Sequence, residues 1–214
     1  AAEKSLSSIC SRGGADSLPA VLDAMNGAAL EPRLALMRVA ARVGGPVALE
    51  RVLASMADAD AAVSGEAVRA ISDWPTLDAV PHLLELAKSA DLNRQVLGLR
   101  GYVRLARIEP SPEAKAGMLT TAMGLAARPD EKKLVVAAWG TLPSAQALDV
   151  LQPLLDDADL RNEAASALIT VAPEAAKIDE ASKTRAQNAI AAVLEKFPEG
   201  DIHQSAHKAR GGIK

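Results

Sequence analysis

The alternation of hydrophobic and polar positions is clearest in the stretch that begins near Asp91. Leu92, Val96, Leu99 and Val103 recur at spacings of three and four residues, so they would share one face of a helix. Similar amphipathic stretches, separated by short polar turns, follow one another along nearly the whole chain. The pattern predicts an all-α fold of about eleven or twelve helices and no sheet.

The hydrophobic pattern also repeats. Residues 71–103 align without a gap with residues 139–171, and Pro75 falls on Pro143. We call this match the long repeat. Repetition at a fixed period is typical of solenoid proteins, and the shift from 71 to 139 is naturally two repeats of about 34 residues. Each helical hairpin is apolar on more than one side, so stacking against its neighbours would complete its core.

Six successive repeats are predicted, each a pair of helices except for a shorter last one: 17–43, 46–74, 76–107, 111–141, 144–172 and 179–197. Proline near the boundaries ends one helix and is compatible with opening the next. An aspartate in the turn within a repeat would cap its second helix, because a carboxylate accepts hydrogen bonds from the free amides there. The four capping candidates are Asp60, Asp91, Asp130 and Asp159.

Two segments resemble HEAT repeats. Residues 157–168, DADLRNEAASAL, look like the second helix of that family, where an aspartate turn precedes an apolar-Arg pair and spaced alanines. Residues 79–86, AVPHLLEL, look like its first helix, with proline in the early turns. The resemblance covers nearly the whole chain and implies a right-handed α-solenoid of about six antiparallel helical hairpins.

The resemblance extends to the bacterial HEAT-like repeats of phycobilisome lyases and to repeat segments of large secreted multidomain proteins. It therefore implies a bacterial protein with a secreted or periplasmic location. The domain organisation predicted is an N-terminal leader at 1–16, one HEAT-like repeat domain at 17–198 and a C-terminal tail or linker at 199–214.

Composition narrows the class of protein. The chain is 49% hydrophobic but only 2% aromatic, and its formal charge of −3 is evenly spread. This balance lacks the basic footprint of a general nucleic-acid binder. No apolar run is long enough to span a membrane. A single cysteine, Cys10, excludes an intramolecular disulfide and, without an assigned base, offers no nucleophile.

The other groups that could carry chemistry have simpler interpretations. His203 and His207 stand four residues apart, the spacing that suits a metal on one helix face, but no third ligand is evident nearby. Trp74 and Trp139 occupy apolar repeat positions, which favours packing. The acidic group at Asp156, Asp157 and Asp159 lies in an intra-repeat turn, which favours capping over acid–base or calcium chemistry. We predict no catalytic residue, no metal and no cofactor.

One set of polar side chains lies off the apolar stripes of the predicted second helices. In HEAT solenoids the second helices line the concave surface, so the resemblance implies that these side chains form a row that faces a partner. We call this row the ladder. The alternative is an ordinary solvated face with ion pairs. The candidate partner-binding residues are Arg69, Asn93, Arg94, Arg100, Arg104, Lys132, Lys133 and Arg161.

The function predicted is that of a non-catalytic protein-binding or scaffolding module, part of a larger protein and not an enzyme. Its partner would be a protein or peptide, either an acidic segment or another domain of the same polypeptide, with no nucleic acid and no membrane. One alternative is a HEAT-like DNA glycosylase-type enzyme, against which the negative charge and scarce aromatics argue. The other is a bilin-lyase-like chaperone, which only the repeat resemblance suggests.

Overall fold

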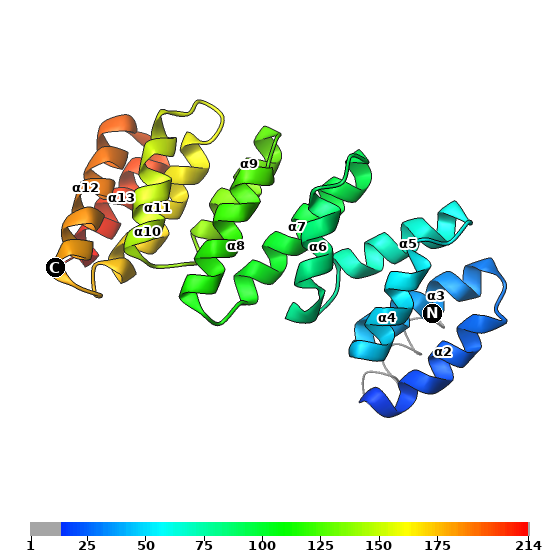
Figure 1. The fold of residues 1–214 in the computed structure, drawn as a ribbon. Helices are drawn as coiled ribbons and strands as arrows, with labels where there is room; N and C mark the ends of the chain where they lie inside the picture. Colours follow the sequence, from blue (N-terminus) through cyan, green and yellow to red (C-terminus); the bar gives the residue numbers. More distant parts are fainter. Residues whose placement is uncertain (1–13, 214) are drawn as a thin grey trace. The chain divides into compact units, whose positions relative to one another are not determined.

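The computed structural model describes residues 14–213, and these form twelve α-helices and three short 3₁₀ helices, with no strand among them (Figure 1). The predicted all-α class and number of helices are therefore confirmed. The chain divides into two compact units, Ala1–Leu105 and Ala106–Lys214. Cys10 and most of the predicted leader lie outside the described residues.

The first unit consists of short helices that follow one another in hairpins. α2 packs on α3 and α4 packs on α5, and α3 also packs on α5. The pairs coincide with the predicted repeats, because the polar turns between them carry the helix stop signals. The elements are η1 (Gly14–Ser17), α2 (Leu18–Asn26), α3 (Leu30–Val43), α4 (Pro46–Ser55), α5 (Ala61–Ser72), η2 (Leu77–Ala79), α6 (Val80–Ala87) and most of α7 (Leu92–Ile108).

The second unit is centred on one helix, α11, which packs against α9, α10, α12 and α13. α8 packs on α9, and η3 continues α10 as a 3₁₀ turn. The elements are α8 (Pro112–Leu125), α9 (Pro129–Trp139), α10 (Ala145–Leu151), η3 (Gln152–Asp156), α11 (Arg161–Ala175), α12 (Glu180–Lys196) and α13 (Gly200–Gly212).

The long repeat is visible in the element boundaries. η2 and α6 together cover 77–87, and the residues aligned with them fall in α10 and η3 at 145–156. α7 at 92–108 corresponds in the same way to α11 at 161–175. The two copies therefore fold into matching elements.

On the predicted stripe of α7, Leu99 and Val103 are buried and Val96 is half-buried. Leu99 and Trp139 are both fully buried, as predicted, and so are Trp74 and Leu151. The periodicity places Leu92 on the buried stripe of its helix, but Leu92 is 62% exposed, so that prediction is wrong. Leu92 is the first residue of α7, where the chain has only begun to turn into the helix.

Two of the predicted aspartate caps are present. Asp60 precedes α5, and its carboxylate accepts a hydrogen bond from the Ala62 amide at 2.8 Å. Asp91 precedes α7 and accepts from the Arg94 amide at 2.9 Å. Each carboxylate satisfies an amide that has no partner within its helix.

The other two predicted caps are wrong. In the turn before α11 the accepting carboxylate is Asp157, which receives the amides of Asp159 at 2.8 Å and Leu160 at 3.2 Å. Asp130 lies inside α9, and Glu131 instead accepts the Arg128 amide at 3.1 Å. Sequence spacing locates such a turn but does not decide which of several neighbouring carboxylates reaches the free amides.

The predicted tail at 199–214 contains a helix instead. α13 packs against α11 and α12, and Ala206, Ala209 and Ile213 are buried. Small side chains let two helices approach closely, so a helix with few large apolar residues can still be packed. The repeat boundary predicted after residue 172 also moves, because α11 continues through Pro173 to Ala175.

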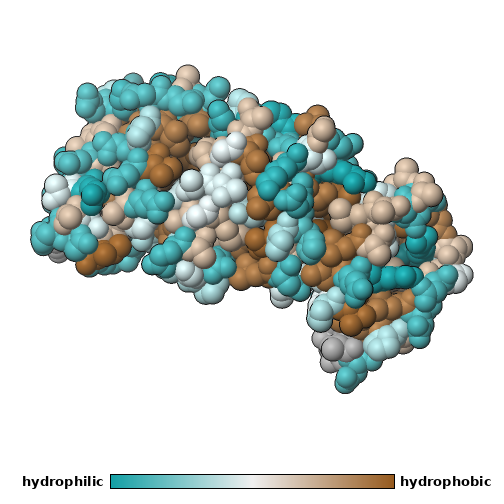
Figure 2. Space-filling view, in the orientation of Figure 1, coloured by the Kyte–Doolittle hydropathy of each residue, from teal (hydrophilic) through white to brown (hydrophobic). Residues whose placement is uncertain are grey.

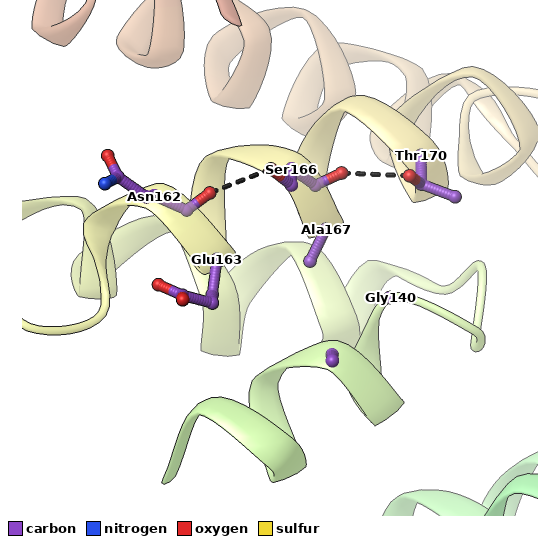
Figure 3. A pocket seen from close by; sticks show the side chains of 7 residues that line it. Gly140, Asn162, Glu163, Ser166, Ala167 and Thr170 are labelled. Atoms are coloured by element: carbon purple, nitrogen blue, oxygen red, sulfur yellow. Dashed lines mark hydrogen bonds between the residues drawn. The ribbon is translucent and has the colours of Figure 1, made fainter. Parts of the chain in front are cut away.

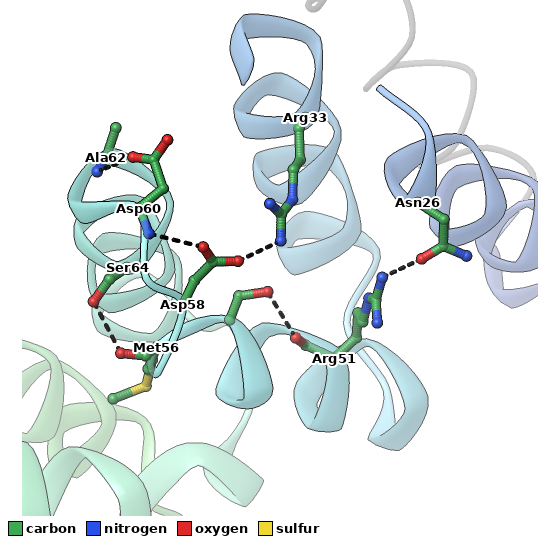
Figure 4. A network of polar contacts seen from close by, with 9 residues as sticks. Asn26, Arg33, Arg51, Met56, Asp58, Asp60, Ala62 and Ser64 are labelled. Carbon is green, nitrogen blue, oxygen red and sulfur yellow. Dashed lines mark hydrogen bonds and ion pairs between the residues drawn. The ribbon is translucent and has the colours of Figure 1, made fainter. Parts of the chain in front are cut away.

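Polar contacts fix the hairpins of the first unit to one another (Figure 4). Arg33 on α3 donates to Asp58 in the α4–α5 turn at 2.6 Å, and Asp58 also accepts the Asp60 amide at 3.0 Å. The amide and the Arg33 guanidinium hold the pKa of Asp58 below its ordinary value. Arg51 on α4 donates to Asn26 at the end of α2.

Hydrophobic and hydrophilic patches alternate over the face of the molecule seen in Figure 2. The large apolar side chains most exposed within the described residues are Leu30, Val47, Leu92, Ile108 and Ile178. Single exposed hydrophobic residues of this kind are normal on a protein surface. None of the helices at 14–213 has the length and hydrophobicity of a membrane span.

Candidate partner-binding grooves

In each unit, a shallow groove lies between two consecutive second helices of the hairpins. The groove between α3 and α5 has a volume of about 460 Å³, and the groove between α9 and α11 about 410 Å³. Two smaller grooves, of about 310 and 300 Å³, lie between α2 and α4 and between the α10–η3 segment and α12. Of the four helices that line the two larger grooves, α5, α9 and α11 carry predicted basic residues and α3 carries none.

A buried carboxylate organises the α3–α5 groove. Glu66 on α5 forms an ion pair with Arg38 of α3 at 3.2 Å and another with Arg69 of its own helix at 3.3 Å. The side chain of Glu66 is only 10% exposed, whereas that of Arg69 is 61% exposed. The carboxylate therefore holds two guanidinium groups in place, and most of the Arg69 side chain still faces solvent.

The α3–α5 groove carries a small excess of positive charge. Its charged lining consists of Arg38, Arg42 and Arg69 against Glu66 and Asp73, with Ala41 and Ala70 between them. The alanines keep the floor of the groove open, while the arginines present planar groups rich in hydrogen-bond donors. Such a surface is suited to carboxylates rather than to an apolar ligand.

The α9–α11 groove has different chemistry (Figure 3). Ser166 donates to the Asn162 carbonyl and Thr170 to the Ser166 carbonyl, each at 2.9 Å, so both hydroxyl hydrogens are used within α11. At Gly140 an added Cβ would lie 3.1 Å from the Ala167 Cβ, which shows how closely the two helices approach. The wall is therefore made mainly of small side chains.

Two residues of the predicted ladder serve the fold itself. Arg94 donates to the Ser64 hydroxyl at 3.1 Å and to the Met56 carbonyl at 3.3 Å. Arg104 donates to the carbonyl of Ser72, the last residue of α5, at 3.1 Å, and to the carbonyl of Trp74 in the turn that follows. A cation at a helix C-terminus satisfies free carbonyls and suits the helix dipole. Burial lowers the pKa of Arg104 from its ordinary value, and the charge of Asp73 opposes that shift.

The remaining ladder residues have separate surroundings. Asn93 and Arg100 are exposed on α7, Lys132 is half-buried on α9, and Lys133 lies 3.7 Å from Glu163. In the second unit, the guanidinium carbon of Arg161 is 5.9 Å from the centre of the Phe197 ring, within range of a cation–π contact. Of the predicted set, the structure brings Arg69 into a groove.

Four residues of the α3–α5 groove, Arg38, Arg42, Glu66 and Asp73, are not among the predicted site residues. A second and shorter internal register aligns Arg38, Arg69 and Arg100, at equal intervals, on three consecutive second helices. The residue before each of these arginines is buried, and the three are Met37, Val68 and Leu99. We call this alignment the arginine register. It places each arginine next to a buried residue of its helix, and it could have identified Arg38 as a site residue from the sequence.

The other groups considered in the sequence have structural surroundings. Trp74 is fully buried, and its indole N–H donates to Asp78 at 2.9 Å. Asp156 pairs with Lys196 of α12, which raises the pKa of that lysine. Within the described part of the chain, no group of three or more His, Cys, Asp or Glu side chains is arranged to hold a metal ion.

A scan against protein-family models and a search of curated proteins each find no match. Among solved structures, the chain is similar to an engineered protein whose crystal structure was determined by the Northeast Structural Genomics Consortium. The TM-score is 0.52 at 19% identity, and the alignment covers 92% of this chain and 96% of that one. A second engineered protein from the same consortium aligns with a TM-score of 0.48 at 17% identity, over 99% of this chain and 71% of its own. Because the first of these proteins has so low a sequence identity, the likeness supports the helical fold alone.

Proposed function

We propose that this chain is a non-catalytic protein-binding or scaffolding module, part of a larger protein, that holds an acidic protein segment against its second helices. The observation that carries the proposal is the α3–α5 groove, where Arg38 and Arg69 are fixed on either side of the buried Glu66. Carboxylates of an acidic segment would receive hydrogen bonds from these guanidinium groups.

The ion pairs within the groove favour specific binding of a partner over non-specific electrostatic attraction. A long arginine side chain loses rotamer freedom when it is immobilised, and this loss opposes association. Here the pairs with Glu66 restrict both arginines before a partner arrives. A planar guanidinium can then form forked hydrogen bonds to a carboxylate with a defined orientation, which a diffuse positive surface does not provide.

We also propose that the helical hairpins form a HEAT-like α-solenoid. A HEAT-like α-solenoid would present successive second helices on one surface, which suits extended protein partners. Three features support it: the hairpins, the matching elements of the long repeat, and the arginine register. The HEAT resemblance and its bacterial character rest on the sequence segments described above.

The surroundings of the aromatic residues argue against the DNA glycosylase-type alternative. Trp74, Tyr102 and Trp139 are buried, and Phe197 is half-buried beside Arg161. Enzymes that act on a base use exposed aromatic faces on which the base can stack. No comparable observation favours the bilin-lyase-like chaperone.

The proposal is tested with a short fluorescent peptide rich in glutamate, titrated against the whole chain at low and physiological salt. We expect binding that Arg69→Gln weakens about tenfold or more, because a hydrogen bond to a charged group contributes about 1.5–3 kcal/mol. Arg185→Gln is the matched control, since it removes an exposed arginine that pairs with Asp149 and lines neither second-helix groove.

Equal weakening by Arg69→Gln and Arg185→Gln would mean diffuse attraction and would reject the groove. An absence of peptide binding at low salt would reject the acidic-segment partner. Thermal melts of both variants identify any loss that reflects unfolding.

Duplex DNA provides the opposing test. We expect no duplex binding tighter than about 10⁻⁴–10⁻⁶ M at physiological salt, the range of non-specific contacts. Tight DNA binding that Arg100→Gln abolishes would overturn the scaffold function and favour the glycosylase-type alternative. The salt dependence of any binding would separate the two ligands further, since counterion release makes duplex affinity fall steeply with salt.

A further inference from the structure

α13 carries a chain of polar contacts that the grooves do not involve. His203 Nδ1 lies 2.8 Å from the Phe197 carbonyl oxygen, and His203 Nε2 lies 3.0 Å from His207 Nε2. His207 Nδ1 is in turn 3.0 Å from a guanidinium nitrogen of Arg210. The two imidazole rings meet edge to face, with their centres 4.5 Å apart.

The chemistry of the donors determines where the imidazole protons lie. Arginine can only donate, so His207 Nδ1 accepts and the proton of His207 is on Nε2. His207 Nε2 then donates to His203 Nε2, which leaves the proton of His203 on Nδ1, facing the Phe197 carbonyl. Both rings are neutral in this arrangement.

We propose that His203 and His207 form a two-nitrogen chelating site for a divalent transition-metal ion of the Cu²⁺ or Ni²⁺ class. The ion would bind between the two Nε2 atoms, with water in its remaining positions. The spacing of four residues, already apparent in the sequence, becomes meaningful because the structure places both residues on one helix in place of the predicted tail.

The separation of the two nitrogens favours one coordination geometry. Imidazole nitrogens bind divalent metals at about 2.0–2.1 Å, so two atoms 3.0 Å apart subtend roughly 90° at the metal. That angle joins neighbouring positions of a square-planar or tetragonal site, the geometry typical of Cu²⁺ and Ni²⁺. A tetrahedral zinc site would need the nitrogens farther apart.

His203 already has the form that a metal ligand requires. Its Nδ1–H donates to a backbone carbonyl, and this contact fixes the ring and leaves Nε2 with a lone pair. Histidine ligands in metalloproteins are commonly oriented in this way by a carbonyl or carboxylate on the other nitrogen. The Phe197 carbonyl would therefore act as the orienting group.

His207 must change before it can bind. Its proton has to move from Nε2 to Nδ1, which frees the Nε2 lone pair without any net release of protons. An N–H at Nδ1 would then face the N–H groups of Arg210, so Arg210 must turn away. Because Arg210 is exposed, the move is sterically simple, but its charge and its hydrogen bond oppose the metal.

The test is a calorimetric titration of the whole chain with Cu²⁺, Ni²⁺ and Zn²⁺ near neutral pH. We expect one site, with the affinity for Cu²⁺ above that for Ni²⁺ and Zn²⁺, following the usual order of divalent metals. His207→Ala should weaken Cu²⁺ binding about tenfold or more, because the second ligand supplies the chelate effect. Arg210→Gln should tighten it, since the opposing guanidinium is removed. His82→Ala is the control and should leave the affinity unchanged.

A spacing variant tests the position of the second imidazole separately from the number of imidazoles in the helix. His207→Ala combined with Lys208→His retains two imidazoles in α13 but puts them five residues apart, on different faces, and should bind as weakly as His207→Ala. The spectrum of bound Cu²⁺ should show two coordinated imidazole nitrogens in the parent protein. It should show one in His207→Ala and one in the spacing variant. Unchanged Cu²⁺ affinity in the double variant His203→Ala/His207→Ala would place the metal elsewhere and overturn the inference.

Discussion

α7 and α11 match through the long repeat without a gap, yet they bury different faces. In α7, Gly98 is buried and Arg100 is exposed. The corresponding residues of α11 are Ser166, which is exposed in a groove, and Leu168, which is fully buried. The same place in the repeat therefore has opposite surroundings in the two copies.

Close approach of two helices explains the face that α7 buries. A Cβ on Gly98 would lie 2.5 Å from the Ala87 nitrogen and from the Leu86 Cβ of α6, so only glycine fits against that helix. α11 has no glycine, and it packs against α12 and α13 in addition to α9 and α10. A repeat thus predicts an element and its place, while the smallest side chains decide which face turns inward.

The greatest loss of stability is expected at a position that is buried in both copies of the long repeat. Leu99→Ala should lower the free energy of unfolding by about 2–5 kcal/mol, the range for a packed leucine, because Leu99 is fully buried. Leu92→Ala on the same helix should change it by less than about 0.5 kcal/mol, since Leu92 is largely exposed. Urea denaturation measures both, and equal values for the two variants would show that the facing of α7 is wrong.

The second largest loss of stability is expected at Gly98 of α7, with no comparable loss at the aligned residue of α11. Gly98→Ala should destabilise the protein by about 2–3 kcal/mol through overpacking against the backbone of α6. Ser166→Ala, its counterpart in α11, should be close to neutral, because Ser166 is exposed and alanine is the better helix former. Thermal and urea melts should separate the two variants clearly. A tolerated Gly98→Ala would argue against the close contact.

A smaller difference should separate the two arginines of α7. Arg104→Gln should cost about 1–2 kcal/mol, because it removes charged hydrogen bonds to carbonyls at the end of α5 and in the turn that follows. Arg100→Gln should leave stability nearly unchanged, since that side chain is exposed. Denaturant midpoints of the two variants provide the measurement. If both substitutions had the same effect, the structural role assigned to Arg104 would be wrong.

The last and smallest change should be a gain in stability. Gly65 lies within α5, and a Cβ added there would have nothing within 4 Å, so Gly65 lacks the packing reason that Gly98 has. Gly65→Ala should therefore stabilise the protein by about 0.5–1 kcal/mol, because alanine loses less backbone freedom in a helix. A fall in melting temperature would show that a side chain at Gly65 makes an unfavourable contact, as one at Gly98 does.

The helical class and most helix positions were predictable because their signals are local. Three- and four-residue periodicity predicted that Leu99 is buried, and the long repeat placed Trp139 opposite the apolar Ile71. Aspartates at helix starts were recognisable as turns, even where a neighbouring carboxylate proved to be the acceptor. α13 was not predicted, because its buried residues are two alanines, Ala206 and Ala209, among glycines and polar groups.

The candidate groove was only partly predictable. Arg69 was identified from its place off the apolar stripe, but its partners Arg38 and Glu66 were not. Arg38 and Glu66 lie on different hairpins, and a contact between helices depends on how those helices are rotated. Sequence periodicity reports which face of one helix is polar, but it does not report which polar groups of two helices meet.

By itself, the sequence determined most of the secondary structure, the order of the hairpins and the residues able to form a core, because these depend on near neighbours along the chain. Only the tertiary structure decided the fate of individual polar side chains. It buried Glu66 between two arginines, bound Arg94 and Arg104 to backbone carbonyls and brought the imidazoles of His203 and His207 together. These outcomes depend on helix rotation and close approach, where one Cβ at Gly98 is enough to exclude an arrangement.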